Sequence, residues 1–397
     1  MTKRLYYLTP MLSSCESCVV SCEKAGEIYS VVLDQTVIFP EGGGQPADHG
    51  FIDGVRILDA QEKDGVVYHI CEGALPVGKT VNVSLDIPRR LDHTEQHTGE
   101  HILSGLAYKL FGARNVGFHM AESYCTIDLD KYLDRDSLAL LEREANAAVR
   151  RNVPVTEEHL DHAALSQVTL RKKAEVVSDD IRVVYIDGGE VDSCTCCGTH
   201  CASSGEVGYI RIGDSQKYKG GVRLWFSCGG RAVAEANALS RTVTELSNSF
   251  STNREELPAA VKKQSEELGA AKRELKARTR ALCSMIAADN KEDAPVLLQE
   301  GFGADDVKML TECVVGRGAA LCLAFGIKDG RTNYRALRAE GVSAPMNELV
   351  KAVNGLVCGK GGGSPAFAQG SAQGEITPEM LDTLKGFVRK WADGQQK

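Results

Sequence analysis

The sequence contains no apolar run that approaches the roughly 18 residues needed to cross a bilayer. Its first residues, Met-Thr-Lys-Arg-Leu-Tyr-Tyr, also lack the apolar core of a secretory signal peptide. We therefore expect a soluble, cytoplasmic protein with no membrane partner.

A nucleotide-triphosphate site is missing as well. The nearest approach to a phosphate-binding P-loop is at Gly359 and Lys360, and it would need Gly at position 354 and Ser or Thr at position 361. The chain has Asn354 and Gly361 there, and no other stretch fits the pattern. The sequence thus predicts a reaction that uses no ATP.

The 397-residue chain has the composition of a globular protein, with 43% hydrophobic and 25% charged residues. This length exceeds what one hydrophobic core usually serves and predicts two or three domains. The 14 cysteines are expected to be reduced or bound to metal, because so long a chain needs no disulfide framework. A net charge of −8 argues against indiscriminate nucleic-acid binding but allows a local basic patch.

The pattern of apolar residues and turns predicts an α+β fold in four parts. Residues 1–90 alternate short β-type runs with Gly, Asp and Pro, which indicates a small β-barrel or a sandwich, with strands at 29–33, 36–39, 66–69 and 80–85. Cys15, Cys18 and Cys22 are expected to be core residues of a further strand, because no second Cys-x-x-Cys follows nearby to complete a zinc ribbon.

The remaining three parts are an α+β domain at 91–235, a helical hairpin or coiled-coil linker at 236–288 and a glycine-rich α/β domain at 289–397. A helix that carries His93 should stop at Gly112, and a second helix should run from 136 to 151. Further strands are expected at 115–119, 124–129, 181–186, 222–228 and 319–325, and further helices at 346–353 and 378–392.

The helical linker should break near 249–253 and then carries a seven-residue repeat. Val261, Leu268, Leu275 and Leu282 would form a narrow apolar seam, which suits a coiled coil or a helical hairpin and favours a homodimer. The polar side of this helix is basic, and such a charge run is either a solvated face or a phosphate-binding one.

A run of three glycines lies between two expected strands, in Phe39-Pro-Glu-Gly42-Gly43-Gly44-Gln45-Pro46. Without side chains, a ligand can approach the backbone closely, and amide groups can converge on an anionic oxygen. The other reading is a flexible hairpin tip; the prolines, which stiffen the loop, and the polar Gln45 weigh against it.

Two stretches predict a metal site. His93, His97 and His101 recur every four residues, about 40° apart around a helix, so neighbouring pairs can bind one ion. About a hundred residues later, a Cys and a His can complete the set, which suits a borderline-soft ion such as Zn²⁺. The spacing leaves the ligands open: His93 could replace His101, and Cys196 has the rivals Cys194, Cys197 and Cys201 beside His200. The alternative is that these residues bind no metal.

The glycine-flanked loop that contains Lys217, Lys219 and Arg223 is either ordinary solvated surface or a phosphate-binding element beside the metal site.

Four motifs in this order carry a family resemblance: Thr36-Val-Ile-Phe-Pro-Glu-Gly-Gly-Gly-Gln45-Pro, His97-Thr-Gly-Glu-His101-Ile-Leu, Cys196-Cys-Gly-Thr-His200 with Gly205-Glu-Val-Gly208, and Gly220-Gly-Val-Arg223 with Cys228-Gly-Gly-Arg-Ala232. Together they resemble the editing domain of alanyl-tRNA synthetase and the freestanding AlaX proteins. The stretch Gly361-Gly-Gly-Ser-Pro-Ala-Phe-Ala-Gln369 resembles the small domain that ends the synthetase and also occurs in DHH-type phosphoesterases. The order matches the long form of AlaX.

The resemblance implies zinc ligands at His97, His101, Cys196 and His200, with His93 outside the motif. Two residues depart from the common family pattern: Cys197, where Gly is frequent, and Glu100, where Thr or Gln is frequent. Cys197 could compete with Cys196 for the metal, and Glu100 could change how water is held. The Asp-His-His motif of the phosphoesterases is absent, which argues against that activity.

The implied activity is hydrolysis of Ser-tRNA(Ala), and of Gly-tRNA(Ala), without aminoacylation, because the catalytic core of the synthetase is missing. Zinc would orient the terminal adenosine or a water, Gln45 and the amides of Gly42, Gly43 and Gly44 would support the ester carbonyl, and Thr36 would read the serine hydroxyl. Lys219, Arg223, the basic helix and the last domain would hold tRNA phosphates. The alternative is a tRNA-binding module with a structural zinc and no deacylase activity.

Overall fold

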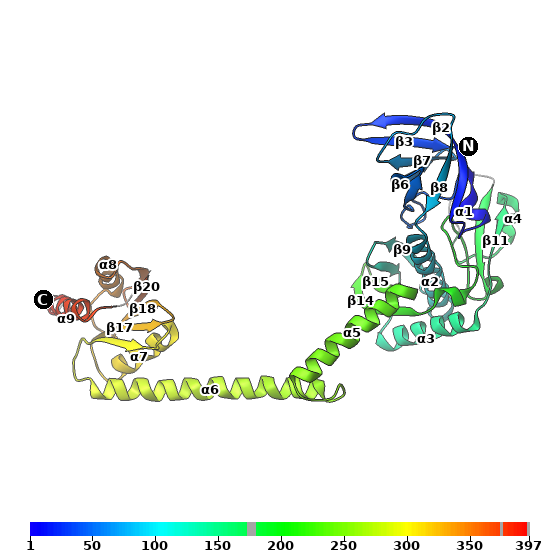
Figure 1. The fold of residues 1–397 in the computed structure, drawn as a ribbon. Helices are drawn as coiled ribbons and strands as arrows, with labels where there is room; N and C mark the ends of the chain where they lie inside the picture. Colours follow the sequence, from blue (N-terminus) through cyan, green and yellow to red (C-terminus); the bar gives the residue numbers. More distant parts are fainter. Residues whose placement is uncertain (173–179, 374–375, 395–397) are drawn as a thin grey trace. The chain divides into compact units, whose positions relative to one another are not determined.

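The computed structural model describes residues 1–397 except 173–179, 374–375 and 395–397. The chain forms two compact units, Met1–Glu245 and Leu246–Lys397 (Figure 1). Both contain helices and sheets, which confirms the predicted mixed α+β class. No helix among the described residues combines the length and hydropathy of a membrane span.

The first unit begins with a closed barrel, drawn mostly in blue in Figure 1. Around the barrel the strands are β2 (Ser14–Ala25), β3 (Ile28–Leu33), β7 (Val66–Cys71), β6 (Val55–Lys63), β5 (Gly50–Ile52) and β8 (Thr80–Leu85). Alternate residues point inward, so side chains such as Val31, Ile57 and Val83 fill the interior. Cys15 and Cys22 pack half-buried against this core, whereas Cys18, also half-buried, is not among the described residues of the cluster, so the predicted core role holds only in part.

The strand expected at 36–39 is wrong in extent. The segment contributes only β4 (Gln35–Thr36), which pairs with β1 (Lys3–Arg4) just before the short helix α1 (Leu5–Leu8). Beyond Thr36, side chains take the backbone groups that a sheet would use. Asp48 accepts from the Phe39 amide at 2.7 Å, and Arg90 donates to the Val37 carbonyl at 2.7 Å.

Helix α2 (Ile87–Phe111) is the centre of the rest of the first unit. Asp86 caps its N-terminus by accepting from the Arg89 amide at 3.2 Å, and Pro88 lies in the first turn. The helix ends where the sequence predicts, because Gly112 adopts the left-handed conformation with φ at 62°. Most residues from 93 to 107 are buried, since elements pack on several sides of the helix.

One sheet beside α2 has the order β14 (Ile210–Tyr218), β15 (Gly221–Cys228), β10 (Cys125–Leu129) and β9 (Asn115–Met120). A second has the order β11 (Val155–Leu160), β12 (Ile181–Ile186) and β13 (Asp192–Thr195). The helices of this region are α3 (Arg135–Arg151), α4 (His162–Gln167) and α5 (Gly229–Ser249). Leu103, Ile127, Leu141 and Leu224 belong to one core cluster that joins α2, α3 and the first sheet.

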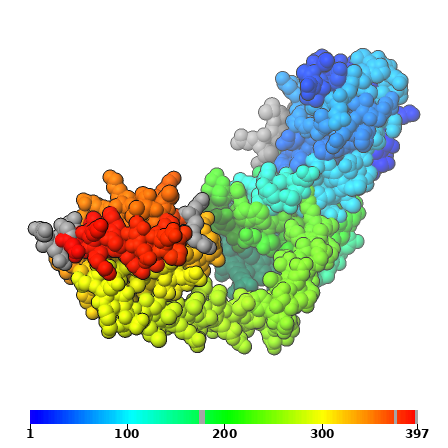
Figure 2. Space-filling model, turned by 60° about the vertical axis from the view of Figure 1, so that its left-hand side comes forward, coloured from blue at the N-terminus to red at the C-terminus, as the bar shows by residue number. Residues whose placement is uncertain are grey.

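The second unit is an α/β layer structure. Its sheet has the order β16 (Val296–Glu300), β17 (Leu321–Lys328), β18 (Arg331–Arg338), β20 (Phe367–Gln373) and β19 (Lys360–Gly363). Alternation along β17 sends Cys322 and Ala324 toward α7 (Ala304–Gly316), and Leu323 and Phe325 toward α8 (Met346–Leu356) and α9 (Pro378–Gly394). Helix α9, drawn red, lies on the surface of this unit (Figure 2).

Helix α6 (Leu257–Asp289) begins after the predicted break and carries the seven-residue repeat. Val261, Leu268, Leu275 and Leu282 are 46% to 67% exposed. The seam is therefore an apolar strip on the surface of the described chain.

The buried pair of Arg90 and Asp48 supplies the first prediction. Both side chains are fully buried, and Asp48 accepts from Arg90 Nε at 3.0 Å as well as from its Nη2. Asp48→Asn would leave a buried guanidinium without its counter-charge, so we expect a loss of about 3–5 kcal/mol in the free energy of unfolding of the first unit. Urea unfolding followed by Trp225 fluorescence, in a Trp391→Phe background, measures this loss.

The matched control is Asp130→Asn, which removes the exposed ion pair with Arg114. It should cost less than about 1 kcal/mol. Equal losses in the two variants would contradict a structural role for the buried pair.

Candidate metal centre

Two histidines of α2 form one side of a buried cluster. His97 and His101 are separated by one helical turn, are 2% and 1% exposed, and have ring centroids 5.4 Å apart. His93 lies one turn earlier and is also buried, but it does not belong to the potential ligand groups found among the described residues. The helix therefore presents two of its three histidines to a shared ion.

The loop after β13 supplies the other side. Cys196 Sγ lies 3.4 Å from His97 Nε2 and 3.4 Å from His200 Nε2. One potential ligand atom from each of His97, His101, Cys196 and His200 lies within 4.8 Å of the other three. Tetrahedral zinc bonds of about 2.0–2.3 Å place ligand atoms roughly 3.3–3.8 Å apart, so the four residues fit a metal ion without large movement.

The electrostatics of the cluster favour the ligand forms of two of its side chains, Cys196 and His200. Burial by itself raises the pKa of the Cys196 thiol, but the neighbouring imidazoles, that of His97 most of all, lower that pKa well below its usual value. Burial and the nearby His101 lower the pKa of His200 to about 3, so this ring is neutral at pH 7. A thiolate beside a neutral imidazole is the state that binds a divalent cation.

Buried hydrogen bonds fix the orientation of His97. Gln45 Oε1 lies 2.9 Å from His97 Nδ1 and accepts from the Thr199 amide at 3.1 Å, while Gln45 Nε2 donates to Thr199 Oγ1 at 2.9 Å. Because the carboxamide oxygen can only accept, His97 Nδ1 carries the hydrogen and Nε2 is left to face Cys196. The sequence predicts Gln45 beside the ester carbonyl; the structure places its amide between His97 and Thr199.

The backbone of the Cys196 loop is held from two directions. Arg182 donates to the carbonyls of Cys196 and Gly198 at 3.0 and 2.9 Å, and Tyr7 donates to the Cys197 carbonyl at 2.7 Å. A Cβ atom at Gly198 would lie 2.1 Å from His97 Cε1, so only glycine lets this loop reach α2. These contacts hold the loop beside α2.

Glu100 lies beside the cluster with a fixed carboxylate. Its Oε1 accepts from Ser104 Oγ at 2.5 Å and from Asn115 Nδ2 at 2.6 Å, and its Oε2 lies 3.8 Å from His101 Nε2. Oε2 thus faces the candidate ligands, whereas Oε1 already accepts two hydrogen bonds.

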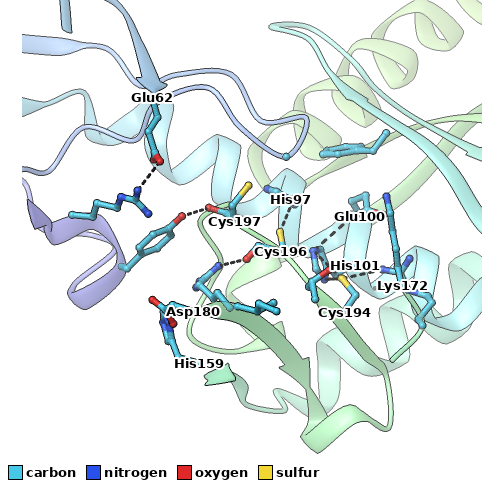
Figure 3. Close-up of a pocket in the computed structure, with 18 of the residues that line it drawn as sticks. Glu62, His97, Glu100, His101, His159, Lys172, Asp180, Cys194, Cys196 and Cys197 are labelled. Atoms are coloured by element: carbon cyan, nitrogen blue, oxygen red, sulfur yellow. Dashed lines mark hydrogen bonds and ion pairs between the residues drawn. The ribbon is translucent and has the colours of Figure 1, made fainter. Parts of the chain in front are cut away.

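The cluster borders a cavity of about 790 Å³. In Figure 3, His97, His101, Cys194 and Cys196 gather at one side of this cavity, and Glu62 lies across from them. The predicted residues that line it are Gly43, His97, Glu100, His101, Cys194, Cys196 and Cys197, and the basic side chains that line it are Arg4, Arg171, Lys172 and Arg182. Glu62, Glu100 and Asp180 line it as well, so the cavity presents charges of both signs.

Other predicted residues lie elsewhere. Thr36 is fully buried, 2.8 Å from His69 Nε2, and is not among the described residues that line the cavity. Lys219 occupies the turn between β14 and β15, and Arg223 pairs with Asp128 at 2.6 Å while stacking on Tyr218. Neither basic residue lines the cavity among the described residues.

The rival cysteines have other environments. Cys194 Sγ lies 3.6 Å from His101 Nδ1 and 3.9 Å from His101 Nε2, and Cys201 is buried with its thiol donating to the Thr94 carbonyl. Cys197 is exposed as a residue, although protein atoms around its sulfur desolvate the thiolate and raise the pKa to about 11. The four-residue ligand group found in the structure therefore contains Cys196.

Sequence reasoning missed Tyr7, Arg171, Arg182 and Thr199. Arg182 interrupts the apolar run of the 181–186 strand, which is a signal that could have been used. Tyr7 and Arg171 lie in segments without a recognisable motif, so only the structure shows their contacts.

Comparison with known proteins adds family relationships. The family described as "Threonyl and Alanyl tRNA synthetase second additional domain" matches residues 181–224, and "tRNA synthetases class II (A)" matches residues 11–89. The chain is 31% identical to the alanyl-tRNA editing protein AlaX-L of Pyrococcus horikoshii, over 98% of this chain and 100% of that one. It is 28% identical to the alanyl-tRNA editing protein Aarsd1 of Danio rerio, over 93% of each chain.

The chain is also 29% identical to an alanine–tRNA ligase of Methanococcus maripaludis, over 96% of this chain but only 44% of the ligase. The match to AlaX-L, in contrast, covers both proteins throughout. The chain therefore belongs to the AlaX-L family of alanyl-tRNA editing proteins.

Proposed function

We propose that the protein is a zinc-dependent hydrolase that deacylates Ser-tRNA(Ala) and Gly-tRNA(Ala). The observation that carries this proposal is the cluster of His97, His101, Cys196 and His200, of which the first three line a cavity that the fixed Glu100 carboxylate also lines. A separate hydrolytic site is needed because one extra hydroxyl or one missing methyl changes binding by only about 1–3 kcal/mol in a synthetic site.

Three imidazole nitrogens and one thiolate are a donor set that suits Zn²⁺. When bound, Zn²⁺ would supply Lewis-acid chemistry and lower the pKa of a coordinated water toward about 7.

The chain's own residues would perform the remaining steps. A water adds to the ester carbonyl carbon and the bond to the ribose oxygen breaks; Glu100 Oε2 takes the proton of the water, and the ribose oxygen gains one. The Gly42 amide is used within its own loop, donating to the Gln45 carbonyl at 3.0 Å. The amides of Gly43 and Gly44 have no backbone partner among the described residues and would face the developing negative charge.

Thr36 is proposed to read the serine hydroxyl. His69 Nδ1 donates to the Val31 carbonyl at 3.1 Å, and burial lowers the pKa of His69 to about 4, so its Nε2 accepts from the Thr36 hydroxyl. Thr36 Oγ1 also accepts from the Ile38 amide at 3.1 Å. One lone pair remains, and the serine side chain would reach it only if neighbouring residues move, because Thr36 is fully buried and does not line the cavity among the described residues.

The tRNA would be held by basic residues away from the cavity. In the first unit these include Lys219 and Arg223 of the β14–β15 hairpin, and in the second unit the basic side of α6. The exposed seam of α6, with its coiled-coil period, would pair with the same helix of a second copy of this chain to form a homodimer.

A cleft of about 260 Å³ in the second unit is a more specific candidate for a phosphate. Asn333 and Arg335 on β18 pair with Ser371 and Gln369 on β20, and Lys360 pairs with Ser371 in turn, so these side chains share one face of the sheet. Arg335 is 7% exposed, and its Nε has no hydrogen-bond partner among the described residues. A buried guanidinium nitrogen without a partner favours an anionic ligand.

The first test of the proposal is release of serine from Ser-tRNA(Ala) by the pure protein. The Cys196→Ala plus His200→Ala double variant should no longer bind zinc, and its deacylation rate should fall more than about 100-fold. The Cys197→Ala variant should bind zinc and deacylate the substrate as the wild type does. Full activity in the double variant would remove zinc from the mechanism. Retention of tRNA by the zinc-loaded wild type without deacylation would favour the alternative, a tRNA-binding module with a structural zinc.

Substitution of Thr36 by Val tests the reading of serine. Loss of one hydrogen bond should slow Ser-tRNA(Ala) deacylation by roughly 3- to 10-fold and leave Gly-tRNA(Ala) deacylation unchanged. Equal slowing of both substrates would mean that the substitution disturbs the barrel and that Thr36 does not select the amino acid.

Arg335→Gln and Lys360→Gln test the cleft of the second unit. Each should weaken tRNA binding and reduce the slope of log affinity against log salt by about 1, because one phosphate contact is lost. Lys351→Gln, an exposed substitution on α8 at the other face of the sheet, is the control. Unchanged slopes in both cleft variants would show that the cleft takes no phosphate of tRNA.

A further inference from the structure

A second group of potential ligands shares His101 with the metal cluster. His101, Asp192 and Cys194 are all buried and lie within 4.8 Å of one another through one atom each. Such a group is either another metal site or a support for the first one. The contacts of Asp192 decide between the two.

Both oxygens of Asp192 already have cationic or hydrogen-bonding partners. Oδ1 accepts from Arg171 Nε at 2.5 Å, and Oδ2 accepts from Arg171 Nη2 at 3.0 Å and lies 2.9 Å from His101 Nδ1. Arg171 Nη2 also lies 3.6 Å from Cys194 Sγ. An ion bound by Asp192 and Cys194 would be repelled by this guanidinium, so the group does not suit a second metal.

We propose that Asp192, held by Arg171, is a positioning residue for the metal ligand His101. A carboxylate can only accept, so His101 Nδ1 carries the hydrogen and Nε2 is the nitrogen left for the ion. This inference rests on the proposed metal site. It assigns to His101 what Gln45 does for His97, with a charged acceptor in place of a neutral one.

Close packing between the start of β13 and α2 brings Asp192 to this position. Asp192 begins β13 and pairs with Ile186 of β12, and its side chain is fully buried. One turn after His101, α2 has Gly105, where a Cβ atom would lie 2.1 Å from the Val191 carbonyl and 2.8 Å from Asp192 Cβ. Glycine at this position therefore lets the strand approach α2 closely enough for the carboxylate to reach the ring.

Arg171 completes the arrangement from a third segment. Its amide donates to the Ser193 carbonyl at 2.8 Å, which fixes the backbone, and its side chain is 6% exposed. The two parallel hydrogen bonds to Asp192 define the plane of the carboxylate and hence the direction of the bond to His101. A neutral residue in place of Arg171 would leave the carboxylate buried without a counter-charge.

The test measures binding of Zn²⁺ and Co²⁺ alone by the full chain, in competition with a coloured chelator. Asp192→Asn, which keeps the shape of the side chain, should weaken Zn²⁺ binding about 10- to 100-fold, and Arg171→Gln should weaken it by a smaller factor. The visible bands of the Co²⁺-loaded Asp192→Asn protein should shift, because the His101 ring is no longer held in one orientation. Loss of structure alone would not produce a shifted but intact tetrahedral spectrum.

Asp92→Asn is the matched control, because Asp92 makes the same two-bond pair with Arg231 without contacting the cluster. It should bind Zn²⁺ as the wild type does. If Asp192→Asn misfolds, Arg171→Gln carries the test, since it leaves both α2 and β13 unchanged. Zn²⁺ affinities of Asp192→Asn and Arg171→Gln within about threefold of the wild type would overturn the inference.

A wild-type stoichiometry of two Zn²⁺ per chain that falls to one in Asp192→Asn would also overturn the inference, because it would show a second metal site. These outcomes differ from a failure of the proposed function. If the wild type binds one Zn²⁺ tightly but releases no serine, the editing activity fails while the role of Asp192 stands.

Discussion

The approach of the Cys196 loop to one face of α2 is the contact on which the candidate site depends. About a hundred residues separate the two partners in sequence, so the ligand cluster exists only if the strands β12 and β13 deliver the loop to the helix. Two glycines make this arrangement sterically feasible: a Cβ atom at Gly198 of the loop would collide with His97 of α2, and a Cβ atom at Gly105 of α2 would collide with the Val191 carbonyl just before β13. Carbonyl groups of the loop are then held by Arg182 and Tyr7.

The histidines of the first unit have different roles because their surroundings differ. His69 is enclosed in the barrel and kept neutral, so it serves as a hydrogen-bonding partner of Thr36. His200 is also neutral but faces a cysteine sulfur. For His101, burial lowers the pKa, but the nearby Cys194, Cys196 and Asp192 raise it above its usual value, which marks a ring surrounded by negative charge. The chemical role of each histidine therefore depends on the residues that surround it.

The sequence predicted well those features that depend on short-range patterns. The helix with its end at Gly112, the strand at 181–186 and the pair of motifs that meet at the metal cluster follow from periodicity, capping and ligand spacing. The sequence was a poor guide to segments whose backbone groups form hydrogen bonds with side chains from distant parts of the chain. The strand expected at 36–39 stops at Thr36 because Asp48 and Arg90 take its hydrogen bonds, and the placements of Gln45 and Thr36 depend on partners 154 and 33 residues away. No local pattern encodes these partners.

The bond from Tyr7 to the Cys197 carbonyl spans 190 residues of chain. During synthesis, the short helix α1 is complete long before the loop that it contacts has left the ribosome. This part of the cavity wall can therefore close only after the chain has been made as far as Cys197, so it depends on a contact of very long range in the sequence.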